Sequence, residues 1–202
     1  NKYNLEHGEE PYGFFDVANI DEDNPENNGV SEYWVAVEDE IIYDYDDIDT
    51  NKPAITVDVW VSPIGIDEAS TTGVEQDPFR TIDYAYSRIY PTEDNPITIY
   101  LTEGVFSPSS NGEDFPILIL SNINLIGQGE EVTIIDAQQT GRVIAIDGSY
   151  QNNIISDLTI TGGEAEYGGG IYAWGFNGTL IDMAISGNTA THNYYSVGGG
   201  LL

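Results

Sequence analysis

The chain contains no cysteine and few basic residues, and both absences exclude classes of protein. Without cysteine, its 202 residues have no disulfide, no thiolate nucleophile and no cysteine-ligated zinc or iron–sulfur site. Lys and Arg number 5 against 35 Asp and Glu, which gives a formal net charge of -30. A surface this negative repels phosphate backbones and anionic lipid, so nucleic-acid binding and electrostatic docking to membranes are excluded.

Long apolar runs and short fixed periods are absent as well. No uninterrupted apolar stretch approaches the ~18 residues of a membrane span, and no heptad or collagen period occurs. The first residues lack the basic and apolar regions of a signal peptide, so a signal was removed or none existed. The absence of cysteine fits an exported bacterial protein, and extreme acidity also occurs where salt or divalent cations are plentiful. We expect an extracellular or cell-surface location with the signal peptide removed.

The sequence divides into two regions of different amino-acid composition. Residues 1–55 are rich in Asn, Asp, Glu, Gly and Pro and contain one strand-like run from Tyr33 to Val37. We expect this region to be an acidic arm or the end of a preceding domain. From residue 56 onward, short Ile, Val and Leu strands alternate with Gly and Asn. This second region stops in mid-strand at Leu202, so we expect its fold to continue beyond that residue.

One helix is predicted in the second region. Asp77 is a good N-cap residue and Pro78 suits the first helical position, so we expect the helix to begin there. Pro91 ends the pattern. Between these points, four apolar residues recur at helical spacing and predict a buried face: Phe79, Ile82, Tyr86 and Ile89.

An internal repeat dominates the C-terminal third of the chain. Residues 152–163 superpose on residues 177–188 with a shift of 25, which places Leu158 on Met183. Weaker copies lie upstream at residues 97–102 and 123–127. Such variable spacing indicates a solenoid whose turns differ in length while its strands stay in register. We expect one interior column to be built from three equivalent residues: Leu125, Leu158 and Met183.

Several motifs resemble a known superfamily. They are Val61-Ser62-Pro63-Ile64-Gly65-Ile66-Asp67, Asp77-Pro78-Phe79-Arg80-Thr81-Ile82, Ile97–Leu101, Gly104-Val105-Phe106, Leu125-Ile126-Gly127, Thr133-Ile134-Ile135-Asp136 and Leu158–Gly163. These motifs resemble the pectin-lyase-like superfamily of right-handed parallel β-helices. The strands Gly168-Gly169-Gly170-Ile171 and Gly198-Gly199-Gly200-Leu201 are similar to repeats of bacterial polymorphic outer-membrane proteins. The resemblance covers residues 56–202 and implies an all-β parallel β-helix, with the helix after Asp77 capping its N-terminal end.

The resemblance is poorly specific for chemistry, because such folds host lyases, hydrolases, adhesins and structural fibres. A lyase needs a Lys or Arg base, and Arg142 has no visible partner, so a surface or ion-pairing role is favoured over a catalytic one. We therefore assign no catalytic residue. We expect a structural, adhesive or glycan-binding protein whose partners are polysaccharide or other surface proteins. The alternative is the N-terminal part of a polysaccharide lyase or glycoside hydrolase whose catalytic coils lie after residue 202.

Four acidic residues are candidate calcium ligands. The 25-residue register places Asp157 and Asp182 on adjacent coils about 4.8 Å apart, where a Ca²⁺ ion would relieve their repulsion. The alternative is that both residues occupy a bend, since Asp tolerates left-handed backbone geometry. Asp67 and Asp77 lie in the loop that precedes the helix and are weaker calcium candidates, because a solvated loop is the favoured explanation for them.

Two aromatic residues near the first triple-glycine strand are candidate ligand contacts. Exposed rings at Tyr172 and Trp174 would stack on sugars, whereas buried rings there would belong to the core. Calcium is the one cofactor that the sequence suggests.

Overall fold

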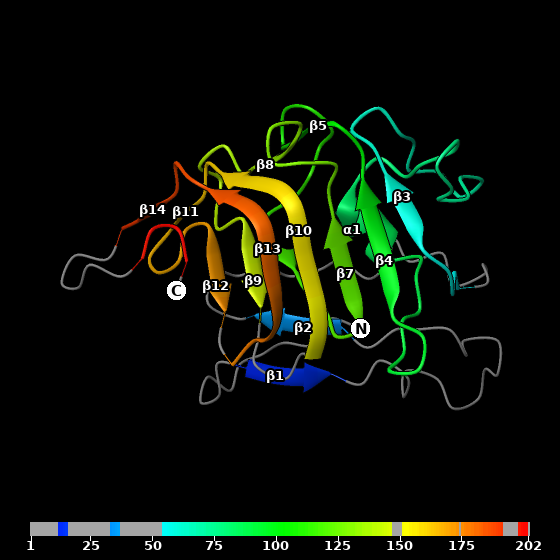
Figure 1. Ribbon diagram of the computed structural model, residues 1–202, viewed down its shortest axis with the longest axis horizontal. Coiled ribbons are helices and arrows are strands. Elements are labelled where there is room, and N and C mark those ends of the chain that lie inside the picture. Colours follow the sequence, from blue (N-terminus) through cyan, green and yellow to red (C-terminus); the bar gives the residue numbers. More distant parts are fainter. Residues whose placement is uncertain are drawn as a thin grey trace. The chain divides into compact units, whose positions relative to one another are not determined.

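A computed structural model describes residues 12–15, 33–36, 54–146, 151–173, 175–191 and 198–201 (Figure 1). The chain divides into two compact units, residues 1–53 and residues 54–202. In the first unit, β1 (Tyr12–Phe15) pairs antiparallel with β2 (Tyr33–Ala36). The strand predicted from Tyr33 is therefore confirmed.

The described residues of the second unit form strands and one short helix, α1 (Ile82–Tyr86). Its largest sheet has the order β3-β4-β7-β10-β8-β5, and β13 pairs with β10; a second sheet is β12-β9-β6, and a third is β11-β14. All of these pairings are parallel. The strands are β3 (Val59–Val61), β4 (Ile97–Leu101), β5 (Gly104–Phe106), β6 (Ile117–Leu118), β7 (Ile123–Ile126), β8 (Thr133–Asp136), β9 (Ile144–Ile146), β10 (Gln151–Thr161), β11 (Glu164–Ala165), β12 (Ile171–Ala173), β13 (Asn177–Ile185) and β14 (Thr189–Ala190).

Successive coils bury their apolar side chains by stacking on one another. Ile99 of β4 lies between Val59 of β3 and Leu125 of β7, and Leu125 in turn pairs with Ile155 of β10. All four side chains are fully buried. No single coil could bury this face alone, so stability comes from the contacts between neighbouring coils. The result is a β-solenoid of about three turns, which confirms the predicted parallel β-helix.

The 25-residue register is confirmed, but one predicted column is wrong. Leu158 pairs with Met183, as the repeat requires. Leu125, however, pairs with Ile155 and not with Leu158. The reason is that β10 is a single long strand bent at Asp157, where φ is 56°. Before the bend β10 pairs with β7, and after the bend, where Leu158 lies, it pairs with β8.

The helix begins later than the sequence predicts. The N-cap is Thr81, whose hydroxyl accepts a hydrogen bond from the Tyr84 N–H at 3.1 Å, and not Asp77. Asp77 instead closes a turn with Val74, and Phe79 pairs with the open edge of β3: the Phe79 N–H donates to the Trp60 carbonyl at 3.0 Å. An edge strand needs backbone partners, and this need overrides the local helical signal.

The predicted buried face of the helical segment is correct despite the shift of its start. All four of its apolar residues are at most 7% exposed: Phe79, Ile82, Tyr86 and Ile89. The helix contacts β3, the first strand of the solenoid, so residues 73–86 cover the edge and interior of the first coil. Among the described residues, no helix has the length and apolar character needed to cross a membrane.

Candidate functional site

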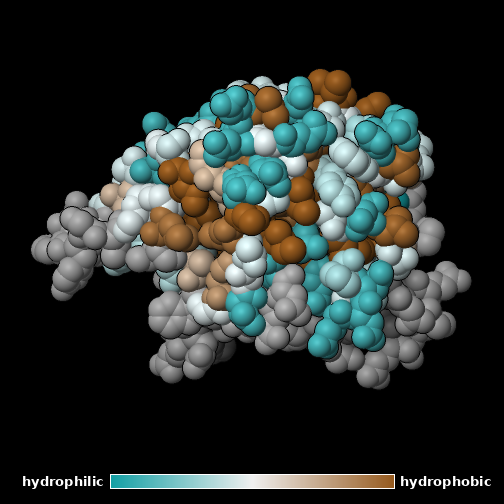
Figure 2. All heavy atoms as spheres, viewed as in Figure 1, coloured by the Kyte–Doolittle hydropathy of each residue, from teal (hydrophilic) through white to brown (hydrophobic). Residues whose placement is uncertain are grey.

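The outward side chains of β3, β4, β7, β10 and β13 form columns that cross five adjacent strands. They alternate with the buried residues, because successive side chains of a strand point to opposite faces. The central column takes one residue from each strand in pairing order: Trp60, Tyr100, Ile126, Ser156 and Ile181. Within this column Ser156 is only 5% exposed, because its neighbours cover its small side chain. Figure 2 shows this face, where apolar residues gather over the middle of the sheet and polar residues surround them.

The outer face offers apolar and hydrogen-bonding groups side by side. The rings of Trp60 and Tyr100 stack with centroids 4.9 Å apart, which is close to the spacing of the strands that carry them. Ile154 and Ile181 are 39% and 49% exposed. Beside them, the Asn124 side-chain carbonyl accepts from the Ile154 N–H at 2.9 Å. The face therefore repeats a similar mixture of groups from coil to coil.

Asp157 and Asp182 lie at equivalent corners of adjacent coils. Their neighbours Ser156 and Leu158 pair with Ile181 and Met183, so the predicted stacking of the two positions is correct. Both residues have left-handed backbone conformations, with φ of 56° and 49°. The Asp157 carboxylate accepts from the Ser156 hydroxyl at 2.6 Å.

The bend geometry thus accounts for aspartate at both positions, and calcium binding there stays a prediction. Within the part of the chain that the structure describes, no group of three or more His, Asp or Glu side chains could hold a metal ion. A cation at this corner would therefore need carbonyl oxygens or water in addition to the two carboxylates.

The other two predicted calcium ligands are engaged in separate hydrogen-bond networks. Asp67 accepts from the Arg80 N–H at 2.6 Å and from the Thr81 hydroxyl at 2.7 Å, and it pairs with the Arg80 guanidinium at 3.7 Å. Asp77 accepts from the N–H and the hydroxyl of Thr72, each at 2.8 Å. Both carboxylates stabilise the loop before α1 through hydrogen bonds, but their hydrogen-bond partners are different residues. Their calcium binding is a prediction that these contacts do not support.

The ring of Tyr172 forms a cation–π contact with Arg142. The Arg142 guanidinium lies 4.6 Å from the ring centroid and donates to the carbonyls of Gly168 at 3.1 Å and Tyr167 at 2.9 Å. Arg142 is only 7% exposed, so it is a buried residue and not the surface residue that the sequence favours. Its role is to tie the turn before β12 to β9. The other predicted ligand contact, Trp174, lies outside the described residues.

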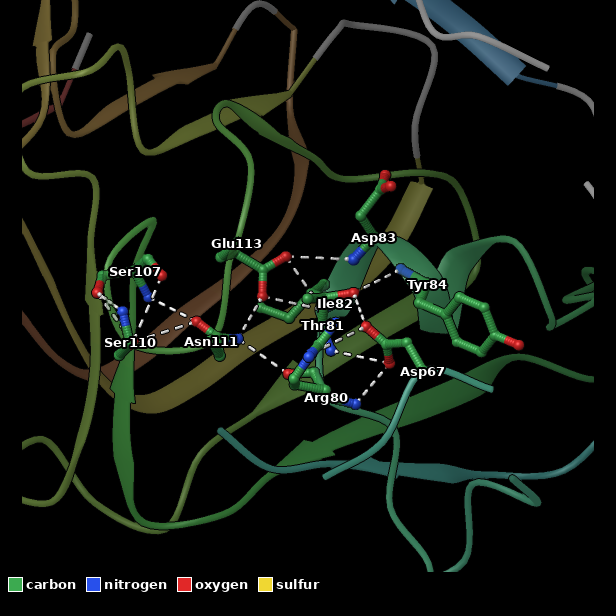
Figure 3. A network of polar contacts seen from close by, with 10 residues as sticks. All are labelled: Asp67, Arg80, Thr81, Ile82, Asp83, Tyr84, Ser107, Ser110, Asn111 and Glu113. Atoms are coloured by element: carbon green, nitrogen blue, oxygen red, sulfur yellow. Dashed lines mark hydrogen bonds and ion pairs between the residues drawn. The ribbon is translucent and has the colours of Figure 1, made fainter. Parts of the chain in front are cut away.

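Sequence reasoning missed the charged group that is most buried among the described residues of the second unit. Glu113 is fully buried, and its carboxylate accepts from the Ile82 N–H at 3.0 Å and the Asp83 N–H at 3.2 Å (Figure 3). The side chain of Asn111 also donates to it, at 3.1 Å. These donors include the first amides of α1, which lie about 30 residues earlier in the chain. No local spacing signals such a contact.

Two acidic groups of this network have raised pKa values. Burial raises the pKa of Glu113 from 4.5 to about 7, while its three hydrogen-bond donors lower it and the charge of Asp83 adds a small increase. The pKa of Asp83 rises to about 6, first through burial and then through the charges of Asp114 and Asp67. The Asp83 side chain nevertheless reaches solvent and points away from Glu113 in Figure 3. Glu113 is therefore the group on which protonation has the larger structural effect.

Comparison with known proteins bears on the fold. The family described as "Protein of unknown function (DUF1565)" matches residues 64–145. It is a family of right-handed β-helix type. The matched stretch runs from the loop before α1 to β9, and it includes Glu113 and Arg142. Together with the parallel solenoid, the match confirms the resemblance to pectin-lyase-like β-helices. No curated protein and no solved structure matches the chain.

Proposed function

We propose that residues 54–202 are a non-catalytic recognition module of an extracellular or cell-surface protein, and that the outer face of β3, β4, β7, β10 and β13 binds a linear polysaccharide. One observation carries the proposal: the column from Trp60 to Ile181 repeats outward groups at the spacing of the strands. A repeating ligand matches a repeating surface, whereas a small molecule needs a concave site.

The charge of the chain limits the kind of polysaccharide. With a net charge of -30, the protein repels anionic polymers such as polyuronates. The outer face offers apolar side chains together with hydroxyl and amide groups, among them Asn124 and Thr179. Sugars present the same combination of C–H faces and hydroxyls. We therefore infer that the ligand is uncharged.

The experiment compares two double variants with matched chemistry. Ile154→Ser with Ile181→Ser removes the two most exposed apolar groups of β10 and β13 on the outer face. Val105→Ser with Val132→Ser removes two valines, each 38% exposed, that lie on β5 and directly before β8, past the bend at Asp157. Affinity electrophoresis through gels that contain neutral glucan, mannan or xylan measures binding.

The isoleucine variant should lose at least tenfold in affinity for the retarding polysaccharide, and the valine variant should bind like the unmodified protein. Equal loss in both variants would show that exposed apolar surface, and not this face, drives retardation. If none of the neutral gels retards the protein, or if polygalacturonate alone does so, the proposed ligand class is wrong.

A further inference from the structure

The described part of the second unit contains two asparagines that are followed directly by glycine, Asn111 before Gly112 and Asn177 before Gly178. An Asn-Gly pair can react with itself, because the backbone nitrogen of the glycine lies within reach of the side-chain amide carbon of the asparagine. Glycine permits this attack better than other residues, since it has no Cβ and its backbone rotates freely. The two pairs share this intrinsic chemistry, and their surroundings in the fold distinguish them.

The side-chain amide of Asn111 is buried and held at both of its polar atoms (Figure 3). Its Oδ1 accepts from the Ser107 N–H at 2.8 Å and from the Ser110 hydroxyl at 3.2 Å. Its Nδ2 donates to the Arg80 carbonyl at 2.9 Å and to the Glu113 carboxylate at 3.1 Å. The amide carbon of Asn111 can turn toward the next backbone nitrogen only after these hydrogen bonds break.

Asn177 has the opposite surroundings at the start of β13. Its side chain is exposed, and the next two residues are exposed as well. Among the residues that the structure describes, none forms a hydrogen bond with the Asn177 side chain. The pairing with β10 is irregular here, because Gln151 lies opposite Asn177 whereas Ile154 lies opposite Thr179. No contact within the described part of the chain therefore opposes a turn of this side chain toward the Gly178 nitrogen.

We propose that Asn177 is a site of spontaneous deamidation, with water as the co-reactant. The Gly178 nitrogen loses its proton and bonds to Cγ of Asn177, the Cγ–Nδ2 bond breaks, and ammonia leaves, which closes a succinimide ring. Water then opens the ring: attack at Cγ gives aspartate, and attack at the backbone carbonyl carbon gives isoaspartate. The reaction needs no oxidant, no reductant and no enzyme, and the proposal does not depend on glycan binding.

Isoaspartate at this position would change the strand as well as its charge. The main chain then runs through Cβ and Cγ of the former Asn177 side chain and is longer by an extra atom. This atom lies just before Thr179, where regular pairing with β10 resumes. Because the pairing of a strand depends on its register, β13 should pair less well with β10 from Thr179 onward.

Peptide mapping by mass spectrometry tests the proposal on the folded full chain, incubated at mildly alkaline pH. Asn177 should deamidate at least about tenfold faster than Asn111, because reaction at Asn111 first requires local opening of its hydrogen bonds. In denaturing urea the two rates should become similar. Asn177→Gln should give no product at this position, since its longer side chain would have to close a less favourable ring. Equal rates in the folded chain, or no product at Asn177, would overturn the proposal.

Hydrogen exchange tests the effect of isoaspartate on the strand, once the isoaspartate form has been separated by chromatography. The matched control is Asn177→Asp, which adds the same charge to an unaltered backbone. The amides of β13 after Thr179 should exchange faster in the isoaspartate form than in this control. Equal exchange in the two proteins would show that the longer backbone does not disturb the pairing of β13, and that consequence of the proposal would be wrong.

Discussion

Asp157 and Asp182 occupy the same left-handed corner of two adjacent coils, with φ of 56° and 49° and with their neighbours paired in register. Neighbouring strands lie about 4.8 Å apart, and two like charges at that separation would repel by roughly 1 kcal/mol in water and by more near a protein surface. The corner thus requires a left-handed backbone conformation and places two acidic residues on adjacent strands. The effects of the conformation and of the charges on stability can be measured separately.

Calcium should relieve the electrostatic repulsion between Asp157 and Asp182. We expect millimolar Ca²⁺ to raise the melting temperature more than NaCl of equal ionic strength, because a divalent ion between the two carboxylates binds only the folded state. Replacing both Asp157 and Asp182 with Asn should remove much of the excess. Differential scanning calorimetry measures the melting temperature in each salt. Identical effects of the two salts would leave screening of the -30 charge as the whole explanation.

The stability cost of the left-handed backbone conformation can be measured by comparing Ala, Asn and Gly at position 157. Asp157→Ala should lower the free energy of unfolding by about 1 kcal/mol relative to Asp157→Asn, because alanine has no side chain that favours φ near 56°. Asp157→Gly should differ from Asp157→Asn by less than about 0.5 kcal/mol. Urea unfolding at constant salt gives these values. Equal stability of the alanine and asparagine variants would contradict the strain argument.

Gly127 tests the close approach of two coils at the same bend. A Cβ atom at this position would overlap the backbone carbonyl oxygen of Asp157, which lies on the next coil. Gly127→Ala should therefore destabilise the fold by about 1–3 kcal/mol, the usual penalty of overpacking. Gly141→Ala is the control, since its nearest neighbour, the Phe115 carbonyl oxygen, would lie at 3.8 Å. Thermal unfolding should separate the two variants, and similar midpoints would refute the predicted overlap.

Arg142 should behave as a structural residue and not as a catalytic base. Removing its guanidinium leaves the Tyr167 and Gly168 carbonyls without this donor, so Arg142→Ala should cost about 1.5–3 kcal/mol of stability. Arg80→Ala, which removes a half-exposed ion pair with Asp67, should cost less than about 1 kcal/mol.

Lyase activity on polygalacturonate is assayed in parallel for the unmodified chain and for Arg142→Ala. The unmodified chain should release no unsaturated product from polygalacturonate, because the anionic polymer is repelled and the Arg142 guanidinium already binds carbonyls and the Tyr172 ring. Product that appears with the unmodified chain and disappears with Arg142→Ala would support the lyase alternative.

The sequence by itself determined the solenoid and much of its register. The shift of 25 residues that pairs Leu158 with Met183 was readable because both copies alternate apolar and polar residues around an Asp that favours a bend. The burial of Phe79, Ile82, Tyr86 and Ile89 was readable for a similar reason, since apolar side chains at regular spacing belong to one buried face.

Only the tertiary structure decided where the helix begins, which residue Leu125 meets and where Glu113 lies. Asp77 closes a turn with Val74, and Phe79 pairs with the open edge of β3, so α1 starts at Ile82 and not after Asp77. The bend at Asp157 lets one strand pair with both β7 and β8, which moves Leu125 opposite Ile155. The contact of Glu113 with the Ile82 amide joins residues 31 positions apart. Each outcome depends on contacts between segments distant in sequence, and such contacts leave no periodic pattern in the residues that make them.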